Sequence, residues 1–290
     1  MPADLPPSAP RERTRHVRVL ADSACALPAE LLTANEIGVV PLRLTVGERS
    51  FTDDEVALEQ LVEMLDQPVM TSGPAPGEWA QAFEDALDGA EAVVALTVSA
   101  AMSSTFDSAR LAGTAYGDRV CVVDTGTAAG GEALVALAAA RRADEGAELQ
   151  SVVATAQDVV HRVRLDATVS SLDHLIRSGR VPSLAGWAGR KMGVQPMFEF
   201  ARDEVRILRP AFSRPAALDR IVRGVASSRT DDDAGLHAAA LHALAPEAGE
   251  LLLSRLRDLG PVDELFAASF SPVMVAHTGA GLAGVAWWWE

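Results

Sequence analysis

Two pairs of hydroxyl side chains stand at positions suited to binding an anion. Thr71 and Ser72 open the segment TSGPAPGEW, whose glycines and prolines form a stiff predicted loop before a helix. Ser103 and Ser104 come directly before TFDSARLA, so we place them in the first turn of another helix. The unpaired N–H groups and positive dipole end of such a turn favour a carboxylate or a phosphate. The alternative is that Ser103 only caps its helix.

Small polar residues also follow three predicted strands. Asp22-Ser23, Ser99 and Asp124-Thr125 come directly after short apolar runs. Ligands of parallel α/β proteins bind at the carboxyl ends of the strands, so we expect these residues to border one crevice. The alternative is that Asp22 and Asp124 cap the turns that follow, and the two roles are compatible.

One histidine and one arginine complete the candidate residues. His277 lies in the glycine-rich turn HTGAGLAG, after a predicted strand PVMVAH. It either contacts a hydroxyl or an anionic group, or is satisfied by the backbone. Arg180 follows a predicted helix capped by Gly179, where it either contacts an anion or is only solvated. The other five histidines have no partner at the spacing of metal ligands, so no metal and no cofactor are predicted.

Several classes of function find no support in the sequence. It contains no GxSxG, Walker or HExxH motif, and the turn at 277–284 does not fit the GxGxxG pattern of a nucleotide loop. A formal charge of −15 without basic stripes disfavours nucleic-acid binding, and it means that any carboxylate site needs its own local donors.

No segment approaches the roughly 20 apolar residues of a membrane span. Residues 1–16 are Pro-rich and Arg-rich, which predicts a disordered tail rather than a signal peptide, and we expect a cytoplasmic protein.

The first half of the chain has the pattern of a parallel sheet. Apolar runs at 17–23, 92–100 and 119–126 predict buried strands, and residues 37–40 predict a short one. Predicted helices lie between and after them, at residues 57–67, 76–87, 103–117, 132–146 and 149–165. Buried strands joined by helices imply a parallel sheet covered on both faces.

The pattern changes near residue 163. Apolar strands then follow more densely, and helices are predicted at 214–225 and 246–258, besides the short one from residue 173 that ends at Gly179. Two of the strands meet at ARDE, a hairpin signal that favours an antiparallel or mixed sheet. We therefore predict an N-terminal α/β domain at 17–163 and a smaller C-terminal α+β domain at 164–290.

Seven segments, taken in order, resemble the DegV family. They are LADSACALPAELLTANEIGVVPLRLTVGERSFTDD, TSGPAPGEW, VSAAMSSTFDSA, VVDTG, LDHLIRSGRVPSLAG, GVQPMF and FSPVMVAHTGAGLAG. The resemblance covers residues 17–286, and the order of the motifs makes it more specific than any one of them. It implies a two-domain fold with a fatty acid buried between a parallel-sheet α/β domain and a smaller α+β domain.

The resemblance also implies roles for single residues. Thr71 and Ser103 match the hydroxyl residues that bind the fatty acid carboxylate in the family, and His277 matches a histidine of the same polar cluster. We add Ser104 to this cluster, although SAAMSST departs from the family's SSxxSGT: Ala100 replaces a serine and Ser104 a glycine. Arg180 matches the arginine associated with the kinase subunit and acyl phosphate. The residues assigned supporting roles are Ser72, Ser99, Asp22 and Ser23.

The leading hypothesis is a non-enzymatic fatty-acid carrier. The resemblance implies that the chain binds one long-chain fatty acid, such as palmitate or oleate, and presents its carboxylate to a fatty acid kinase, which supplies ATP binding and catalysis. The main alternative is a stand-alone serine hydrolase or acyltransferase, with Ser103 as nucleophile and His277 as base. A third is a lipid-responsive protein that acts through a partner surface. We expect a monomer.

Overall fold

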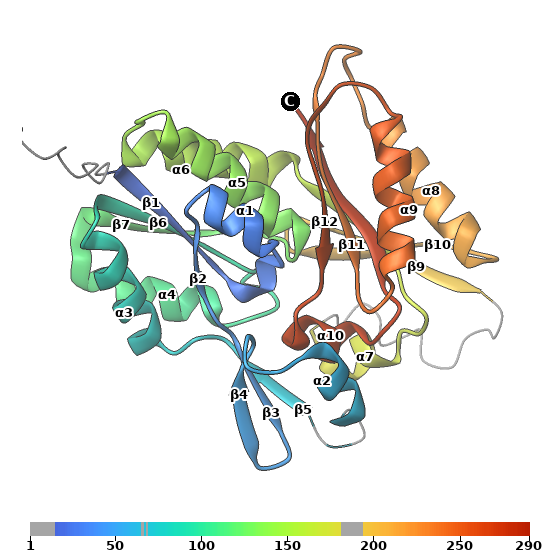
Figure 1. Cartoon of the computed structure of the whole chain (residues 1–290), viewed down its shortest axis with the longest axis horizontal. Coiled ribbons are helices and arrows are strands. Elements are labelled where there is room, and N and C mark those ends of the chain that lie inside the picture. Colours follow the sequence, from blue (N-terminus) through green and yellow to red (C-terminus); the bar gives the residue numbers. More distant parts are fainter. Residues whose placement is uncertain (1–14, 65–66, 68, 181–193) are drawn as a thin grey trace, which may run out of the picture.

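The computed structural model describes residues 15–64, 67, 69–180 and 194–290. Its strands form three sheets, with helices between and around them (Figure 1). The architecture is α/β, with a parallel-sheet domain and a second domain built on a mixed sheet, which confirms the predicted fold class.

The first sheet contains four parallel strands in the order β2-β1-β6-β7. These strands are β1 (Arg15–Asp22), β2 (Gly38–Val40), β6 (Ala90–Thr97) and β7 (Val120–Asp124). The strand order reverses between β1 and β6, which is the point where α/β sheets open a crevice. Strand β1 begins at Arg15, inside the predicted tail 1–16, and residues 1–14 lie outside the described part of the chain, so the tail stays a prediction.

Helices cover both faces of this sheet. One face carries α3 (Pro76–Leu87) and α4 (Thr105–Gly113), and the other carries α5 (Gly130–Asp144) and α6 (Leu149–Arg162). Shorter pieces join the strands, namely η1 (Ser23–Cys25), α1 (Ala29–Ala34) and η2 (Thr114–Arg119). The start of α4 at Thr105 leaves Ser103 just outside the helix rather than within its first turn.

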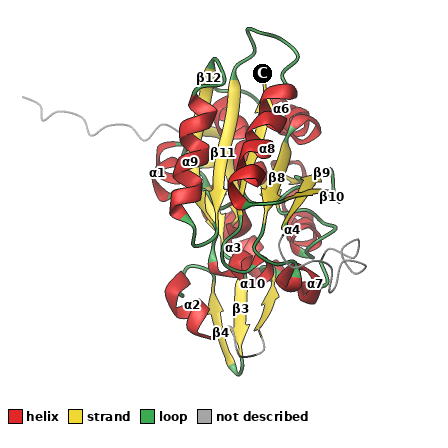
Figure 2. Ribbon diagram, turned by 90° about the vertical axis from the view of Figure 1, so that its right-hand side faces the viewer, coloured by secondary structure: helices red, strands yellow, loops and turns green. Residues whose placement is uncertain are grey.

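The second sheet has six strands in the order β10-β9-β8-β13-β11-β12. They are β8 (Arg164–Thr168), β9 (Gln195–Ala201), β10 (Glu204–Ala211), β11 (Leu236–His242), β12 (Val262–Ser269) and β13 (Ala283–Trp289). Only β11 and β12 are parallel. Helices α8 (Arg214–Ser227) and α9 (Pro246–Arg257) cover its outer face (Figure 2). Strand β13 lies inside the sheet, which explains why the tryptophan-rich end of the sequence is so apolar.

Helix α5 lies between the two sheets and is buried nearly all round. Its first residue, Gly130, approaches the second sheet so closely that a Cβ atom there would lie 2.7 Å from the side chains of Ala239 and Leu241. One hydrophobic cluster therefore runs from β1 through α5 to β11. The second sheet starts at Arg164, and the division of the chain at residue 163 stays a prediction.

A third, antiparallel sheet was not predicted. It consists of β3 (Arg43–Val46), β4 (Arg49–Thr52) and β5 (Val69–Ser72) in the order β4-β3-β5, with α2 (Leu58–Met64) beside it (Figure 2). Thr71 and Ser72 therefore belong to a strand and not to the predicted loop. The loop prediction was wrong because a strand of four residues is too short to show a clear hydrophobic alternation. Such a strand is specified by the strand it pairs with, and here Thr71 pairs with Leu44 of β3.

One predicted strand is a helix. The segment PVMVAH forms α10 (Pro272–Thr278), which lies beside α7 (Asp173–Ser178) between the third sheet and the second (Figure 1). A short apolar run fits either a strand or a buried helix. Two local signals favour the helix: Pro272 at its first position, and Gly279 at its end with a φ of 72°.

Candidate functional site

A cavity of about 270 Å³ lies where the three sheets meet. Its apolar wall comes from both halves of the chain and includes Leu42, Val98, Met102, Leu165, Phe198, Phe200, Phe270 and Leu282. Its volume is close to the lower end of the roughly 300–1,000 Å³ range of small-molecule sites. The predicted site residues that line it are Thr71, Ser72, Ser103, Ser104, Arg180 and His277.

Three of these side chains form a polar cluster. Oγ1 of Thr71, near the end of β5, lies 2.8 Å from Nε2 of His277 on α10. Nη2 of Arg180, just after α7, lies 3.5 Å from the same hydroxyl oxygen. The three residues come from distant parts of the sequence, so tertiary structure alone brings them together. The cluster offers a hydroxyl, an imidazole and a guanidinium, which are donors suited to a carboxylate.

His277 is held neutral in this cluster. Burial lowers the pKa of its imidazole to about 4, and the positive charge of Arg180 acts in the same direction. A neutral imidazole carries one proton, and that proton can lie on Nε2 and be donated to Thr71 Oγ1. The hydroxyl of Thr71 is then free to donate its own hydrogen to a ligand. His277 therefore orients the Thr71 hydroxyl so that it can donate a hydrogen bond to a ligand in the cavity.

The start of α4 supplies the second hydroxyl group of the site. The Ser103 hydroxyl lies 2.7 Å from Thr105 Oγ1 and accepts a hydrogen bond of 3.3 Å from the Thr105 N–H. Ser103 thus stabilises the turn that opens α4, although it is not the N-cap residue that the capping alternative expected. Ser104 is the N-cap residue, but its side chain makes no capping hydrogen bond.

Gly73 allows the two hydroxyl segments to meet. A Cβ atom at Gly73 would lie 2.3 Å from Thr105 Oγ1, so a larger residue would push β5 away from the first turn of α4. The family resemblance implied that Thr71 and Ser103 belong to one head-group site, and the structure brings their segments side by side.

The supporting residues Asp22 and Ser99 do not line the cavity. Asp22 is fully buried and accepts hydrogen bonds from the N–H groups of Ala24 at 2.9 Å and Val98 at 2.8 Å. It caps η1, as the alternative expected. Ser99 donates to Asp203 in the β9–β10 turn at 2.5 Å. Both residues hold the backbone around the cavity and make no part of its surface.

Asp53 is a positioning residue that sequence reasoning missed. The Ser23 hydroxyl donates to its Oδ2 at 2.7 Å, and the N–H of Val273 donates to its Oδ1 at 2.8 Å. Asp53 therefore ties η1 to the first turn of α10 and so fixes the helix that carries His277. Its partners are distant in sequence, and the acidic run FTDDE gave no sign of such a role.

A second, more polar cavity of about 250 Å³ adjoins the first. The residues shared by the two cavities are Thr71, Ser178, Arg180 and His277. Arg177 and His174 add further nitrogen donors to the second cavity. The polar cluster of Thr71, His277 and Arg180 therefore lies between the apolar 270 Å³ cavity and the basic 250 Å³ cavity.

Ser103 and His277, both in the described part of the chain, do not form the nucleophile–base pair of a serine hydrolase. Ser103 would need His277 within hydrogen-bond distance as its general base. Among the described residues, Ser103 bonds to Thr105 and His277 bonds to Thr71.

Comparison with known proteins gives the same family as the motifs. The family model described as "Uncharacterised protein, DegV family" matches residues 16–290. The chain belongs to the DegV family. A DegV domain-containing protein of Streptomyces coelicolor is 32% identical over 277 residues, which cover 94% of this chain and 98% of the relative.

Solved structures of DegV proteins have the same fold. The structure described as "Fatty Acid Binding of a DegV family Protein from Thermus thermophilus" is 25% identical, has a TM-score of 0.85, and covers 95% of this chain and 100% of that protein. The Bacillus subtilis DegV structure, described as a fatty acid binding protein, is 24% identical with a TM-score of 0.83, and it covers 95% and 100% of the two chains. The latter comparison supports the fold alone.

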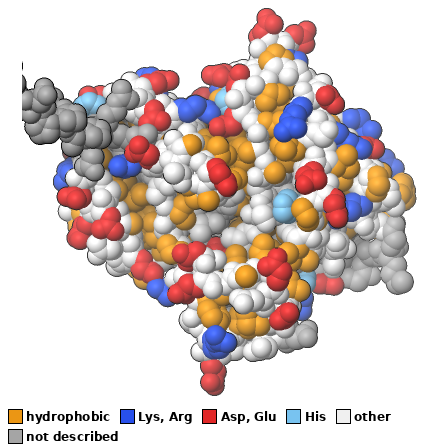
Figure 3. Space-filling model, viewed as in Figure 1, with side chains coloured by type: hydrophobic (Ala, Val, Ile, Leu, Met, Phe, Trp, Pro, Cys, Tyr) orange, Lys and Arg blue, Asp and Glu red, His pale blue; other side chains and the backbone are white. Residues whose placement is uncertain are grey.

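One face of this DegV-family chain is mixed in charge. Acidic and basic side chains are interspersed over the described part of the face shown in Figure 3, within a sequence of net charge −15. Within the described ranges, none of the helices has the length and apolar character needed to cross a membrane.

Proposed function

We propose that this DegV-family protein binds one long-chain fatty acid, such as palmitate or oleate, in the 270 Å³ cavity. The observation that carries the proposal is an apolar chamber bordered by the polar cluster of Thr71, His277 and Arg180. Fatty acid binding by the Thermus thermophilus relative supports the same class of ligand.

The acyl chain supplies most of the driving force. Each buried methylene contributes about 0.8 kcal/mol, so enclosing most of a long chain contributes on the order of 10 kcal/mol. Association itself costs about 4–15 kcal/mol. A short acid offsets less of that cost than a long one, so the site favours long acyl chains.

The head group is bound by local donors. A carboxylate that leaves water needs hydrogen bonds in compensation, and the whole protein is strongly negative. In the proposal, the Thr71 hydroxyl donates to one carboxylate oxygen, with His277 behind it. Ser103 and Ser104, at the start of α4, line the same cavity and donate to the other oxygen.

Mass spectrometry tests this function directly. We expect native spectra of the purified protein to show one fatty acid per chain, and the delipidated protein to bind oleate much more tightly than octanoate. A protein that purifies empty and also ignores added palmitate and oleate would overturn the proposal. Ester turnover that disappears in Ser103→Ala would instead support the hydrolase.

We further propose that the bound carboxylate is presented to a fatty acid kinase, which performs the chemistry. The basic cavity beside Thr71 supports this, because a phosphoryl group added to the carboxylate would enter it and meet Arg180 and Arg177. The protein then acts as a monomeric, non-enzymatic carrier in the cytoplasm, where the kinase finds ATP.

Arg180→Ala is expected to retain the fatty acid but to lower acyl phosphate formation by a fatty acid kinase at least about tenfold, since a bidentate charge pair contributes about 1.5–3 kcal/mol. The matched control is Arg206→Ala, which removes an exposed arginine of β10 that pairs with Glu204. Loss of fatty acid binding in Arg180→Ala would show that Arg180 belongs to the carboxylate clamp. Equal phosphorylation of both variants would contradict its role with the kinase.

A further inference from the structure

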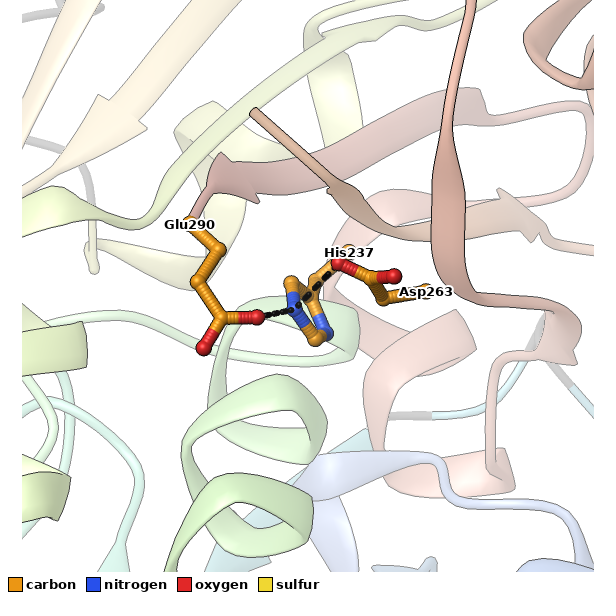
Figure 4. Close-up of side chains that lie close together, drawn as sticks. All are labelled: His237, Asp263 and Glu290. Carbon is orange, nitrogen blue, oxygen red and sulfur yellow. Dashed lines mark hydrogen bonds and ion pairs between the residues drawn. The ribbon is translucent and has the colours of Figure 1, made fainter. Parts of the chain in front are cut away.

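One histidine and two carboxylates meet at the end of the second sheet. His237 is the second residue of β11, Asp263 the second of β12, and Glu290 follows β13. The pairing of Leu236 with both Val262 and Trp289 brings these strand ends together. Figure 4 shows both carboxylates directed at the imidazole. Sequence spacing predicted no metal site because the three residues lie on different strands.

The separations suit a single metal ion. Nε2 of His237 lies 3.3 Å from Glu290 Oε2 and 3.7 Å from Asp263 Oδ2, and the three atoms all lie within 4.8 Å of one another. In a tetrahedral zinc site with bonds of about 2.1 Å, neighbouring ligand atoms are about 3.4 Å apart. Only small side-chain movements are therefore needed to bring all three atoms to bonding distance.

The imidazole is fixed in the orientation that a ligand needs. His237 is only 3% exposed, and its ring stacks on Trp288 with the centroids 4.1 Å apart and the planes 6° from parallel. Nδ1 lies 3.5 Å from Glu264 Oε2. Nη2 of Arg141, which can only donate, also lies 3.4 Å from Nδ1, so the ring proton lies on Nε2 while that contact is made. For Nε2 to bind an ion, the proton has to move to Nδ1, where it faces Glu264. A carboxylate behind a ligating histidine is the usual outer partner of such a metal site.

The local charge and backbone also favour a cation. Three carboxylates, of Asp263, Glu264 and Glu290, surround the ring, and Arg141 pairs with Glu264 at 3.0 Å. A Cβ atom at Gly235 would lie 1.5 Å from Asp263 Oδ2, so this glycine is what allows the carboxylate to approach.

We propose that His237, Asp263 and Glu290 bind one divalent transition-metal ion, with Zn²⁺ as the expected occupant. Imidazole and carboxylate ligands suit such ions, and three protein ligands leave a fourth position for water. The site is separate from the fatty acid cavity. Ala129, just before α5, lines that cavity, whereas Arg141 in the last turn of α5 reaches His237. A helix of this length spans about 20 Å. A bound ion would tie together the ends of three strands.

Zinc titration of the full chain, freed of any affinity tag and stripped with EDTA, tests this site. We expect one Zn²⁺ per chain by calorimetry and a higher melting temperature with Zn²⁺, because an ion that binds only the folded state stabilises it. Asp263→Asn and Glu290→Gln should each weaken binding at least about tenfold, since even outer partners of metal ligands contribute 10–100-fold. Both side chains are at the surface, so circular dichroism should show an intact fold.

Glu247→Gln is the matched control, because it removes one exposed carboxylate from α9 and should leave Zn²⁺ binding unchanged. The proposal is overturned if no saturable binding occurs, or if both ligand variants bind Zn²⁺ as tightly as the parent. Equal affinity for Mg²⁺ and Zn²⁺ would also overturn it, since that result indicates unspecific attraction to acidic groups.

Discussion

Replacing Thr71 with valine is expected to weaken palmitate or oleate binding by roughly ten- to a hundredfold, with little change in the free energy of unfolding. A hydrogen bond to a charged group contributes about 1.5–3 kcal/mol, and 1.4 kcal/mol corresponds to a tenfold change in Kd. Valine leaves the neutral His277 facing a methyl group in place of the hydroxyl 2.8 Å away. It is β-branched like threonine, so β5 should form as before.

Calorimetric titration of the delipidated protein measures this effect. The control is Thr45→Val, which removes a hydroxyl from the neighbouring strand β3, where it bonds to Ser50 at 2.9 Å outside the cavity. Ser103→Ala should also weaken binding, but less, because that hydroxyl is already bonded to Thr105. Unchanged affinity in Thr71→Val, or the same loss in Thr45→Val, would contradict the assigned head-group site.

Glu132→Gln is expected to stabilise the protein increasingly as the pH rises. Glu132 lies in the first turn of α5 and is fully buried beside the carboxyl group of Asp22. Burial, and then the negative charge of Asp22, raise its pKa well above the ordinary 4.5. Asp22 accepts two backbone N–H groups, so Glu132 is the group of this pair that keeps its proton.

The pH dependence follows from the release of this proton on unfolding. The unfolded chain loses it near pH 4.5, whereas the folded protein keeps it to higher pH. Stability is therefore lost as the pH rises between these two pKa values, by up to about 1.4 kcal/mol per pH unit. Glutamine has no proton to lose, so the difference in unfolding free energy between variant and parent should grow with pH over that window.

Urea unfolding between about pH 5 and 8 tests this prediction. Glu145→Gln, at the exposed end of the same helix, is the control and should show no such growth. A difference between Glu132→Gln and the parent that stays constant with pH would show that the folded protein does not hold the Glu132 proton.

Much of the fold could be predicted because its signals are local. The parallel strands are nearly continuous apolar runs, and the amphipathic helices between them repeat every three to four residues. The β9–β10 hairpin was predicted from ARDE, and the structure confirms it, with Arg202 and Asp203 both at positive φ. The third sheet and α10 were missed, since their short segments are specified by the partners they pack against.

The candidate site likewise has some features that the sequence predicted and others that depend on tertiary contacts. The residue types and motif order of the sequence predicted Thr71, Ser103, His277 and Arg180 as site residues, and all four line the cavity. The sequence did not reveal that Thr71 and His277 share a hydrogen bond, that Asp53 positions α10, or that Asp22 and Ser99 support the backbone instead of lining the cavity. Each of these facts depends on a contact between elements far apart in the chain.

By itself, the sequence determined the family, the α/β class and the set of hydroxyl, imidazole and guanidinium groups available to a ligand, because these depend on residue type and local periodicity. Only the tertiary structure decided which groups meet. It joined β5, α7 and α10 at one apolar cavity, and it gathered His237, Asp263 and Glu290 from three strand ends. Strand register and helix packing set these distances, and neither is encoded within any single segment of the chain.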